Sequence, residues 1–384
     1  MRAQRRTPFP VLVLTALCAL LAYDGAAAQS SQSLGVSAVF QGYDFDDALG
    51  VDAAQLLMIP IAYRLPVGER LSAELFSAWA EGRVKRAGRV SVLNGLVDTR
   101  LHFGFRASPK AILTLSVNLP TGNVTHDSEE AVVASVLSSD ILGFRESNWG
   151  TGAYVTTGVA TAQRVGDWGV GLGLSYRAAD GFEPRSDTAL TYSPGNELRA
   201  RVGVDRNVGE TGKFTAGFTF QSFGSDEFGG RNLFQSGNRL RVDAAYSFRA
   251  GSTTWSASAA NVWRASGDLN LQILNSSGVA VGDSLVSTET QNLVFASLNG
   301  AIPIASTIYL RPVLDFRLQD MGTTPGEVDT GGSWILGGGF GLPLRVMSLD
   351  VFPRIKVNVG RIKAADGTTQ GAVGLEASGT VRFR

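Results

Sequence analysis

Apolar and polar side chains alternate one by one along many short segments of this chain. Residues 239–249, 213–221 and 347–359 each place apolar side chains on one face and charged or other polar side chains on the other. In 239–249 the apolar face consists of Leu240, Val242, Ala244, Tyr246 and Phe248. A period of two is that of a β-strand. Because charges recur on one face of strand after strand, the pattern favours a wall between lipid and a water-filled lumen.

A large soluble β-sandwich or propeller is the alternative all-β architecture, since it also contains many short strands. Such a protein does not need the same polarity in strand after strand. No segment of the mature chain approaches the roughly 18 apolar residues of a membrane helix. Because only helices and closed sheets satisfy the backbone within lipid, the sequence predicts an all-β fold, a transmembrane antiparallel up-and-down β-barrel.

The last residues, Gly371 to Arg384, form one more alternating segment, whose apolar face ends in the aromatic residue Phe383. This segment resembles the closing strand of bacterial outer-membrane β-barrels. Those barrels usually finish on the aromatic residue itself, whereas here Arg384 follows it. The resemblance implies insertion into the outer membrane by its assembly machinery, with outer-membrane lipid and lipopolysaccharide as partners.

The N-terminal residues predict export from the cytoplasm. Arg2, Arg5 and Arg6 precede an apolar run from Phe9 to Ala22, and small residues follow at 26–28. This is the pattern of a secretory signal peptide, which we expect to be cleaved after residue 28. Residues 29–384 then form a single barrel domain.

Composition excludes several kinds of site and partner. The only cysteine, Cys18, lies in the signal peptide, so the mature chain has no disulfide and no thiolate metal site. The chain has 34 basic and 34 acidic residues, and removing three arginines and Asp24 leaves 31 minus 33, a net charge of −2. This balance gives no reason to expect a nucleic-acid partner. No metal-ligand spacing is present, and we expect no cofactor.

Connections of unequal length separate the alternating segments. Short connections are predicted at 66–69, 108–110, 166–167, 208–212, 250–251, 303–306 and 343–345. Longer, more polar connections are predicted at 43–50, 80–92, 120–149, 179–195, 225–236, 265–288, 319–329 and 361–370. Their alternation is typical of outer-membrane barrels, which have tight periplasmic turns and long external loops. Counting the segments predicts sixteen strands, or fourteen if 33–41 and a neighbour are not strands.

Tryptophans and prolines support two smaller predictions. The tryptophans near long connections are Trp79, Trp149, Trp263 and Trp334, and those near short turns are Trp168 and Trp255. This distribution is typical of the two aromatic girdles of a membrane barrel, with scattered core residues as the alternative. Pro60, Pro312 and Pro353 fall inside predicted strands, where the missing N–H predicts a bulge or a bend.

Two stretches of the chain carry a family resemblance. Residues 117–123 have the sequence Val-Asn-Leu-Pro-Thr-Gly-Asn, and after the longest loop come Trp-Gly-Thr-Gly at 149–152 and a glycine-alternating strand at 170–176. These stretches resemble the outer-membrane barrel family associated with a phenol-degradation (MetA) pathway. The resemblance implies outer-membrane transport of small hydrophobic or aromatic compounds. From the residues alone, Pro120 and Gly122 end a strand and begin a turn.

Three functions are consistent with such a barrel. The first is a channel or transporter for small hydrophobic or aromatic solutes, and the second is a general diffusion porin, which a wide polar lumen would favour. The third, a lipid-modifying hydrolase, would need a serine and a histidine on the lipid-facing surface. His126 falls in an external loop and His102 on the lumen side, so we expect no catalytic role and no enzyme.

Strand direction and side-chain parity place six basic residues on the lumen face in the outer half of the barrel. They are Arg199, Arg201, Arg239, Arg241, Arg317 and Lys356. Like charges repel one another unless countercharges or solvent intervene. The loop 120–149 supplies four acids, which flank the apolar stretch 131–137; they are Asp127, Glu129, Glu130 and Asp140.

We expect the loop 120–149 to fold inward, with its acids meeting the basic residues and its apolar part narrowing the lumen. In the alternative arrangement the loop projects into solvent. The arginines then pair with Glu197, with Asp243 or with lipopolysaccharide phosphates.

Overall fold

The computed structural model describes residues 32–46, 50–274, 280–305, 308–321, 332–346, 349–363 and 367–383. The predicted signal peptide, residues 1–28, lies outside these ranges, and so does most of the predicted connection 319–329.

Long antiparallel strands form the main sheet of the described chain. They are β1 (Ser33–Phe45), β2 (Ala53–Val67), β3 (Leu71–Arg86), β4 (Arg89–Ser108), β5 (Ala111–Leu119), β6 (Tyr154–Val165), β7 (Trp168–Ala179), β9 (Glu197–Val208), β10 (Gly212–Phe223), β13 (Arg239–Ala250), β14 (Thr253–Arg264), β17 (Gln291–Ala305), β18 (Ile308–Met321), β19 (Ser333–Gly341), β21 (Leu349–Lys363) and β22 (Thr369–Phe383). The sheet has 17 members because a short strand, β20 (Leu344–Val346), continues β19 along β21. Sixteen strand positions therefore surround the lumen, which confirms the predicted number.

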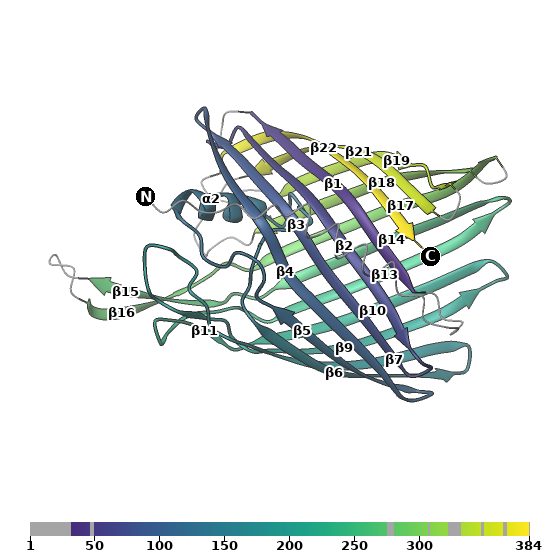
Figure 1. Ribbon diagram of the computed structural model, residues 1–384, viewed down its shortest axis with the longest axis horizontal. Coiled ribbons are helices and arrows are strands. Elements are labelled where there is room, and N and C mark those ends of the chain that lie inside the picture. Colours follow the sequence, from purple (N-terminus) through teal and green to yellow (C-terminus); the bar gives the residue numbers. More distant parts are fainter. Residues whose placement is uncertain are drawn as a thin grey trace. The chain divides into compact units, whose positions relative to one another are not determined.

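The first and last strands close the sheet on itself. β1 pairs with β22 from Leu34 opposite Phe383 to Phe45 opposite Ala372, and it pairs with β2 on its other side. Figure 1 shows the purple β1 lying beside the yellow β22. The segment 33–41, on which the fourteen-stranded alternative depended, is thus a strand with two neighbours. Closure leaves the main sheet without a free edge, as a sheet within lipid requires.

The two faces of the wall differ in chemistry as the alternation predicts. On the outward face of β21 and β22, Val357 is 51% exposed and Val373 58% exposed, whereas the inward-facing Lys356 and Glu376 are each 5% exposed. Among the described residues, no helix has the length and apolar character needed to cross a bilayer. A closed barrel with an apolar outer surface, tight turns at one end and long connections at the other is the architecture of bacterial outer-membrane proteins.

Four of the predicted long connections contain strands, and one of them belongs to the main sheet. The predicted connection 80–92 was wrong, because β3 continues to Arg86 and β4 begins at Arg89, with a tight turn at Ala87 and Gly88, both of positive φ. The charged residues in this stretch alternate with Gly82 and Val84. The stretch is therefore polar because the strands extend past the lipid into water, and not because it forms a loop.

Three other long connections contain the strands of a separate five-stranded sheet. These strands are β8 (Tyr192–Ser193), β11 (Ser225–Phe228), β12 (Arg231–Gln235), β15 (Asp268–Leu274) and β16 (Ala280–Ser287).

The three prolines predicted to lie inside strands, Pro60, Pro312 and Pro353, do so without shifting the register of the pairing. Between β1 and β2 the pairing stops at Ile61 and resumes at Met58, with Pro60 in between. Between β17 and β18 it stops at Val313 and resumes at Leu310, on either side of Pro312. Pairing of β21 with β22 is continuous through Pro353. No bulge therefore stands at these positions, since a missing N–H removes a hydrogen bond but inserts no residue, and the other predicted outcome, a bend, stays a prediction.

The orientation of the wall predicts how two substitutions to arginine differ in their effect on stability. Val357→Arg places a charge on the lipid face near the middle of β21, where we expect a loss of about 2–4 kcal/mol in the free energy of unfolding. Ser258→Arg, in the middle of β14 on the lumen face, is the control and should cost much less. Guanidinium unfolding in phospholipid vesicles, followed by tryptophan fluorescence, measures both. Equal losses would contradict the assignment of the two faces.

Candidate functional site

The loop 120–149 contains the helix α2 (Ser128–Leu137), whose start is fixed by a capping box. The Asp127 carboxylate accepts the backbone N–H groups of Glu129 and Glu130, each at 2.9 Å. The Glu130 carboxylate in turn accepts the Asp127 N–H at 3.1 Å. These bonds satisfy donors that the first turn of a helix otherwise leaves unpaired. Two of the four acids predicted to meet the arginines are therefore used within the helix itself.

The helix α2 packs against the lumen faces of β2, β3 and β4. Its residues Val133 and Leu137 are fully buried in one apolar cluster with Leu56, Ala80, Val84, Leu93 and Val97 of these strands. Gly82 makes the close approach possible, because a Cβ there would lie within 2.9 Å of Val133, Leu137 and Trp149. These contacts agree with the predicted inward direction of the loop.

Trp149 closes the loop from its C-terminal side. Its side chain is completely buried in the same cluster, and its indole Nε1 donates to the Ala80 carbonyl at 3.0 Å. The prediction that Trp149 belongs to an aromatic girdle was therefore wrong. The loop places this residue inside the lumen, and sequence position alone does not show that.

A buried carboxylate, Asp98 of β4, holds both ends of the loop. It accepts hydrogen bonds from the Asn118 amide at 2.8 Å, the Gly122 N–H at 2.9 Å and the Thr151 N–H at 2.7 Å. Gly122 cannot be replaced without movement, because a Cβ there would lie 1.8 Å from the Trp149 carbonyl oxygen. The Leu-Pro-Thr-Gly and Trp-Gly-Thr-Gly segments thus meet at one carboxylate, a structural role that accounts for both.

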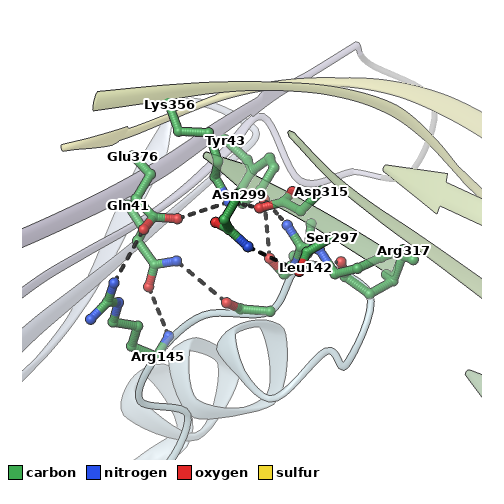
Figure 2. A network of polar contacts seen from close by, with 12 residues as sticks. Gln41, Tyr43, Leu142, Arg145, Ser297, Asn299, Asp315, Arg317, Lys356 and Glu376 are labelled. Carbon is green, nitrogen blue, oxygen red and sulfur yellow. Dashed lines mark hydrogen bonds and ion pairs between the residues drawn. The ribbon is translucent and has the colours of Figure 1, made fainter. Parts of the chain in front are cut away.

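After the helix, the loop residues Ile141 to Arg145 are bound to the adjoining part of the lumen wall, which runs from β1 through β22 to β18 (Figure 2). Arg317 of β18 donates to the Ile141 carbonyl at 2.8 Å and to the Tyr43 hydroxyl at 2.9 Å. The Tyr43 hydroxyl donates onward to the Leu142 carbonyl at 3.1 Å. Two strands far apart in sequence, β1 and β18, therefore hold the same loop segment.

The rest of the network in Figure 2 carries paired charges across β1, β18, β21 and β22. Gln41 accepts the Arg145 N–H at 2.7 Å, and the Arg145 guanidinium lies 3.3 Å from Glu376. Lys356 lies 3.1 Å from the same glutamate and 2.8 Å from Asp315. The Lys356 charge is thus balanced by two carboxylates.

The six predicted basic residues all lie on the lumen face, but their partners differ. Arg199 pairs with Glu197 at 2.7 Å, and Arg201 and Arg241 share Asp243 at 3.0 and 3.3 Å. Glu197 and Asp243 are the partners that the arginines were expected to have in the alternative arrangement, in which the loop projects into solvent. Arg239 lies over the Phe223 ring at 5.4 Å. Lys356 stands at the middle of β21, so its predicted place in the outer half stays a prediction.

The predicted contacts of the loop acids were wrong for most of them. Asp127 caps the helix, Glu130 lies 3.9 Å from the His126 ring, and Glu129 is exposed. Asp140 meets an arginine, but this is Arg264, at 3.7 Å, which the sequence did not single out. Arg317 does tie the wall to the loop, but it binds the Ile141 backbone carbonyl, a contact that no charge pattern reveals.

Two cavities lie beside the segment 141–145, one after the other along the lumen wall. The outer cavity, about 460 Å³, is lined by Arg241, Asp243, Ser297, Asp315, Arg317 and Lys356. The inner cavity, about 440 Å³, is lined by Arg145, Asn299, Arg311, Val313, Phe352 and Arg354. Successive lumen-facing positions of β17, β18 and β21 line first one cavity and then the other. The second cavity is therefore the nearer to the short periplasmic turns.

No family model matches the chain, and no curated protein matches its sequence. Membership of the family associated with phenol degradation therefore stays a prediction.

Solved structures with a similar fold include OccK11 (OpdR) of Pseudomonas aeruginosa, at 10% identity, with 92% of this chain and 95% of that chain covered and a TM-score of 0.48. They also include a mutant of the TodX monoaromatic hydrocarbon channel, at 11% identity, with 93% and 91% covered and a TM-score of 0.44. An outer-membrane channel from Pseudomonas putida F1 is 16% identical, with 71% and 97% covered and a TM-score of 0.39. These likenesses concern the barrel and carry no statement about solutes.

The hydrogen bonds of Asp98 predict how firmly the loop is held. Asp98→Ala leaves buried N–H groups without an acceptor, each worth about 1–3 kcal/mol, and should loosen the loop. We expect trypsin to cleave the folded barrel after Arg145 at least several-fold faster than in the wild type, as measured by mass spectrometry. Asp205→Ala is the control, because that half-exposed carboxylate lies away from the loop and pairs with Lys213, at 3.5 Å. Equal cleavage in both variants would contradict the role of Asp98.

Glu146 predicts a pH dependence of loop docking. Burial raises the pKa of its carboxyl, an effect that Arg100, 3.7 Å away, opposes. The pKa of the Glu146 carboxyl is thus higher in the folded protein than in the unfolded chain. The contribution of this carboxyl to stability is complete below its pKa in the unfolded chain, and it is lost as the pH rises through its pKa in the folded protein. Glu146→Gln should therefore slow hydrogen exchange of residues 141–146 relative to the wild type at pH 7.5 and have no effect near pH 4. Faster exchange in the variant at pH 7.5 would mean that the Arg100 ion pair outweighs burial.

Proposed function

We propose that this protein is an outer-membrane channel for small hydrophobic or aromatic solutes, narrowed by the inward loop 120–149. The observation that carries the proposal is the packing of Val133, Leu137 and Trp149 against the lumen face of β2–β4. A loop in that position fills the side of the lumen next to β2–β4, so a solute cannot pass there. What is left runs along β13 to β21, where the two cavities lie.

The sizes of these cavities favour a selective channel over a general diffusion porin. Each has a volume of 440–460 Å³, within the range of sites that hold one small organic molecule. Phe295 contributes its side chain to the outer cavity, and Val313 and Phe352 theirs to the inner one. Apolar side chains among charged ones suit a solute with an apolar body. A general porin needs an open, water-filled path instead.

The hydrolase alternative has less support from the positions of the histidines. His102 faces the lumen, where its Nδ1 lies 2.6 Å from the Ser116 hydroxyl, so this pair is on the wrong side of the wall for an outer-leaflet lipid. Near His126 the Asp127 carboxylate is already bound to the first turn of α2. A catalytic acid would have to orient the imidazole instead.

The proposed surroundings follow from the outer surface. Exposed apolar residues cover the middle of the strands, and Trp168, Trp263 and Trp334 are each more than a third exposed near strand ends. This is the distribution expected of side chains that meet lipid and its headgroups. Outer-membrane lipid, lipopolysaccharide and the assembly machinery are therefore the proposed partners.

Shortening the loop tests the proposal directly. Deleting residues 125–139 removes α2 and should raise single-channel conductance in planar bilayers several-fold, because the lumen beside β2–β4 becomes open. The Arg317 guanidinium, which donates to the Ile141 carbonyl in the intact loop, also becomes free to face the lumen, so selectivity should shift toward anions. Each variant is first checked for a heat-modifiable gel shift, which reports a folded barrel.

A matched control removes a loop that does not enter the lumen. Deleting residues 228–231, the tip between β11 and β12, should leave the conductance unchanged. Unchanged currents after the 125–139 deletion in a correctly inserted barrel would contradict the proposed constriction. A large, unselective current in the wild type would favour the general porin.

A further inference from the structure

We propose that the inner cavity binds the carboxylate of a small organic acid through Arg145, Arg311 and Arg354. This inference rests on the proposed channel function and names the chemical class of its solute. The site lies on the periplasmic side of the segment 141–145, so a solute that has passed the loop reaches it next.

The sheet register brings the guanidinium groups of two strands together. Arg311 of β18 stands opposite Gly341 of β19, and Gly341 stands opposite Arg354 of β21. All three positions face the lumen, and the middle one has no side chain. The two arginine side chains can therefore reach the same space above the glycine from either side. A Cβ at residue 341 would lie 3.1 Å from the Pro353 carbonyl oxygen and 3.7 Å from the Arg354 Cβ.

The charges of the inner cavity are not balanced within it. Among the described residues that line the cavity there are three arginines and no aspartate or glutamate. The outer cavity differs, because Asp243 and Asp315 accompany its basic residues. Glu376, which lies outside the cavity lining, pairs with Arg145 and is also within electrostatic reach of Arg354, but it carries one negative charge for three arginines and Lys356. The remaining positive charge favours an anionic ligand.

Arg354 also carries a hydrogen-bond donor with no acceptor. Its Nε is buried and has no partner within the described part of the chain. Buried donors are rarely left unpaired, because the unmade bond costs free energy. A rotation of the Arg354 side chain would turn this donor toward a carboxylate in the cavity, for which the planar guanidinium offers two parallel donors of the right geometry.

The other walls of the cavity fit the organic part of an acid. Val313 and Phe352 supply apolar surface, and Thr254, Ser256, Ser378 and Thr380 supply hydroxyl groups around it. The volume of about 440 Å³ exceeds what an inorganic anion needs. An aromatic or short aliphatic carboxylate, with its charged end at the arginines and its body against Phe352, fills this arrangement better.

Titration calorimetry on the detergent-solubilised full-length barrel tests the site without requiring conduction. The probes are benzoate, benzyl alcohol as its uncharged counterpart, and inorganic phosphate. We expect the wild type to bind benzoate more tightly than either of the other two. The double variant Arg311→Gln/Arg354→Gln should weaken benzoate binding by about tenfold or more, the change expected from losing a charge-assisted pair.

Arg249→Gln is the matched control. Arg249 lies on the lumen face of β13 near a periplasmic turn, where it donates to the Gly251 carbonyl at 3.0 Å, and it does not line the cavity. This variant should bind benzoate as the wild type does. A heat-modifiable gel shift confirms that each variant is folded.

Three results would overturn the proposal. They are no benzoate binding by the wild type, equal affinity in the double variant and the wild type, and phosphate binding as tight as that of benzoate, which would assign the cavity to inorganic anions. The channel proposal fails separately, if deleting residues 125–139 leaves the conductance unchanged. The calorimetric result does not depend on that outcome.

Discussion

The pairing of β1 with β22 is the constraint on which the rest of the structure depends. Within lipid no water is available for unpaired backbone groups, so a sheet must close or lose several kcal/mol at each exposed edge group. Once Leu34 lies opposite Phe383 and Phe45 opposite Ala372, parity assigns most side chains to lipid or to lumen, and the lumen parity changes within β4 at the register shift between Val97 and Arg100. The charges of many strands then face one enclosed space. Both the ion pairs and the position of the inward loop follow from that enclosure.

The lumen has two kinds of wall, and this explains why the loop takes its position. On β1 to β4 the lumen face is largely apolar, with Val39, Leu56, Met58, Leu93 and Val97 all buried. If such a side chain stayed in contact with water, the folded protein would lose about 1.5–3 kcal/mol of burial free energy for each one. The loop residues Val133, Leu137 and Trp149 cover this wall. The apolar side chains of the wall are therefore buried, while the rest of the lumen stays open.

The opposite wall is charged, and its repulsions are resolved locally. Glu197 and Asp243 each serve two arginines, since Arg177 and Arg199 both meet Glu197. A pair of like charges about 4 Å apart costs roughly 1 kcal/mol in water and about 4 kcal/mol at an effective dielectric near 20. Carboxylates placed between arginines remove that cost. Arg311 and Arg354 stand further along this wall, in a cavity that has no carboxylate of its own.

The sequence by itself determined the class of fold, the number of strands, which face of each strand meets lipid, and which basic residues face the lumen. All of these follow from a period of two and from connection lengths, which are local properties of the chain. The sequence also indicated that the acidic, apolar segment 120–149 would fold inward, because its composition complements an enclosed charged space.

Only the tertiary structure decided which groups meet. Asp98 holds Gly122 and Thr151, which lie 24 and 53 positions away in the sequence, and Arg317 binds the Ile141 carbonyl, 176 positions away, because the closed barrel makes these residues neighbours. Asp127 and Glu130 went to the helix cap, since a partner three residues away is reached at a smaller entropic cost than an arginine across the lumen. The placing of Arg311 and Arg354 around Gly341 depends on strand register, and no local pattern in the sequence specifies it.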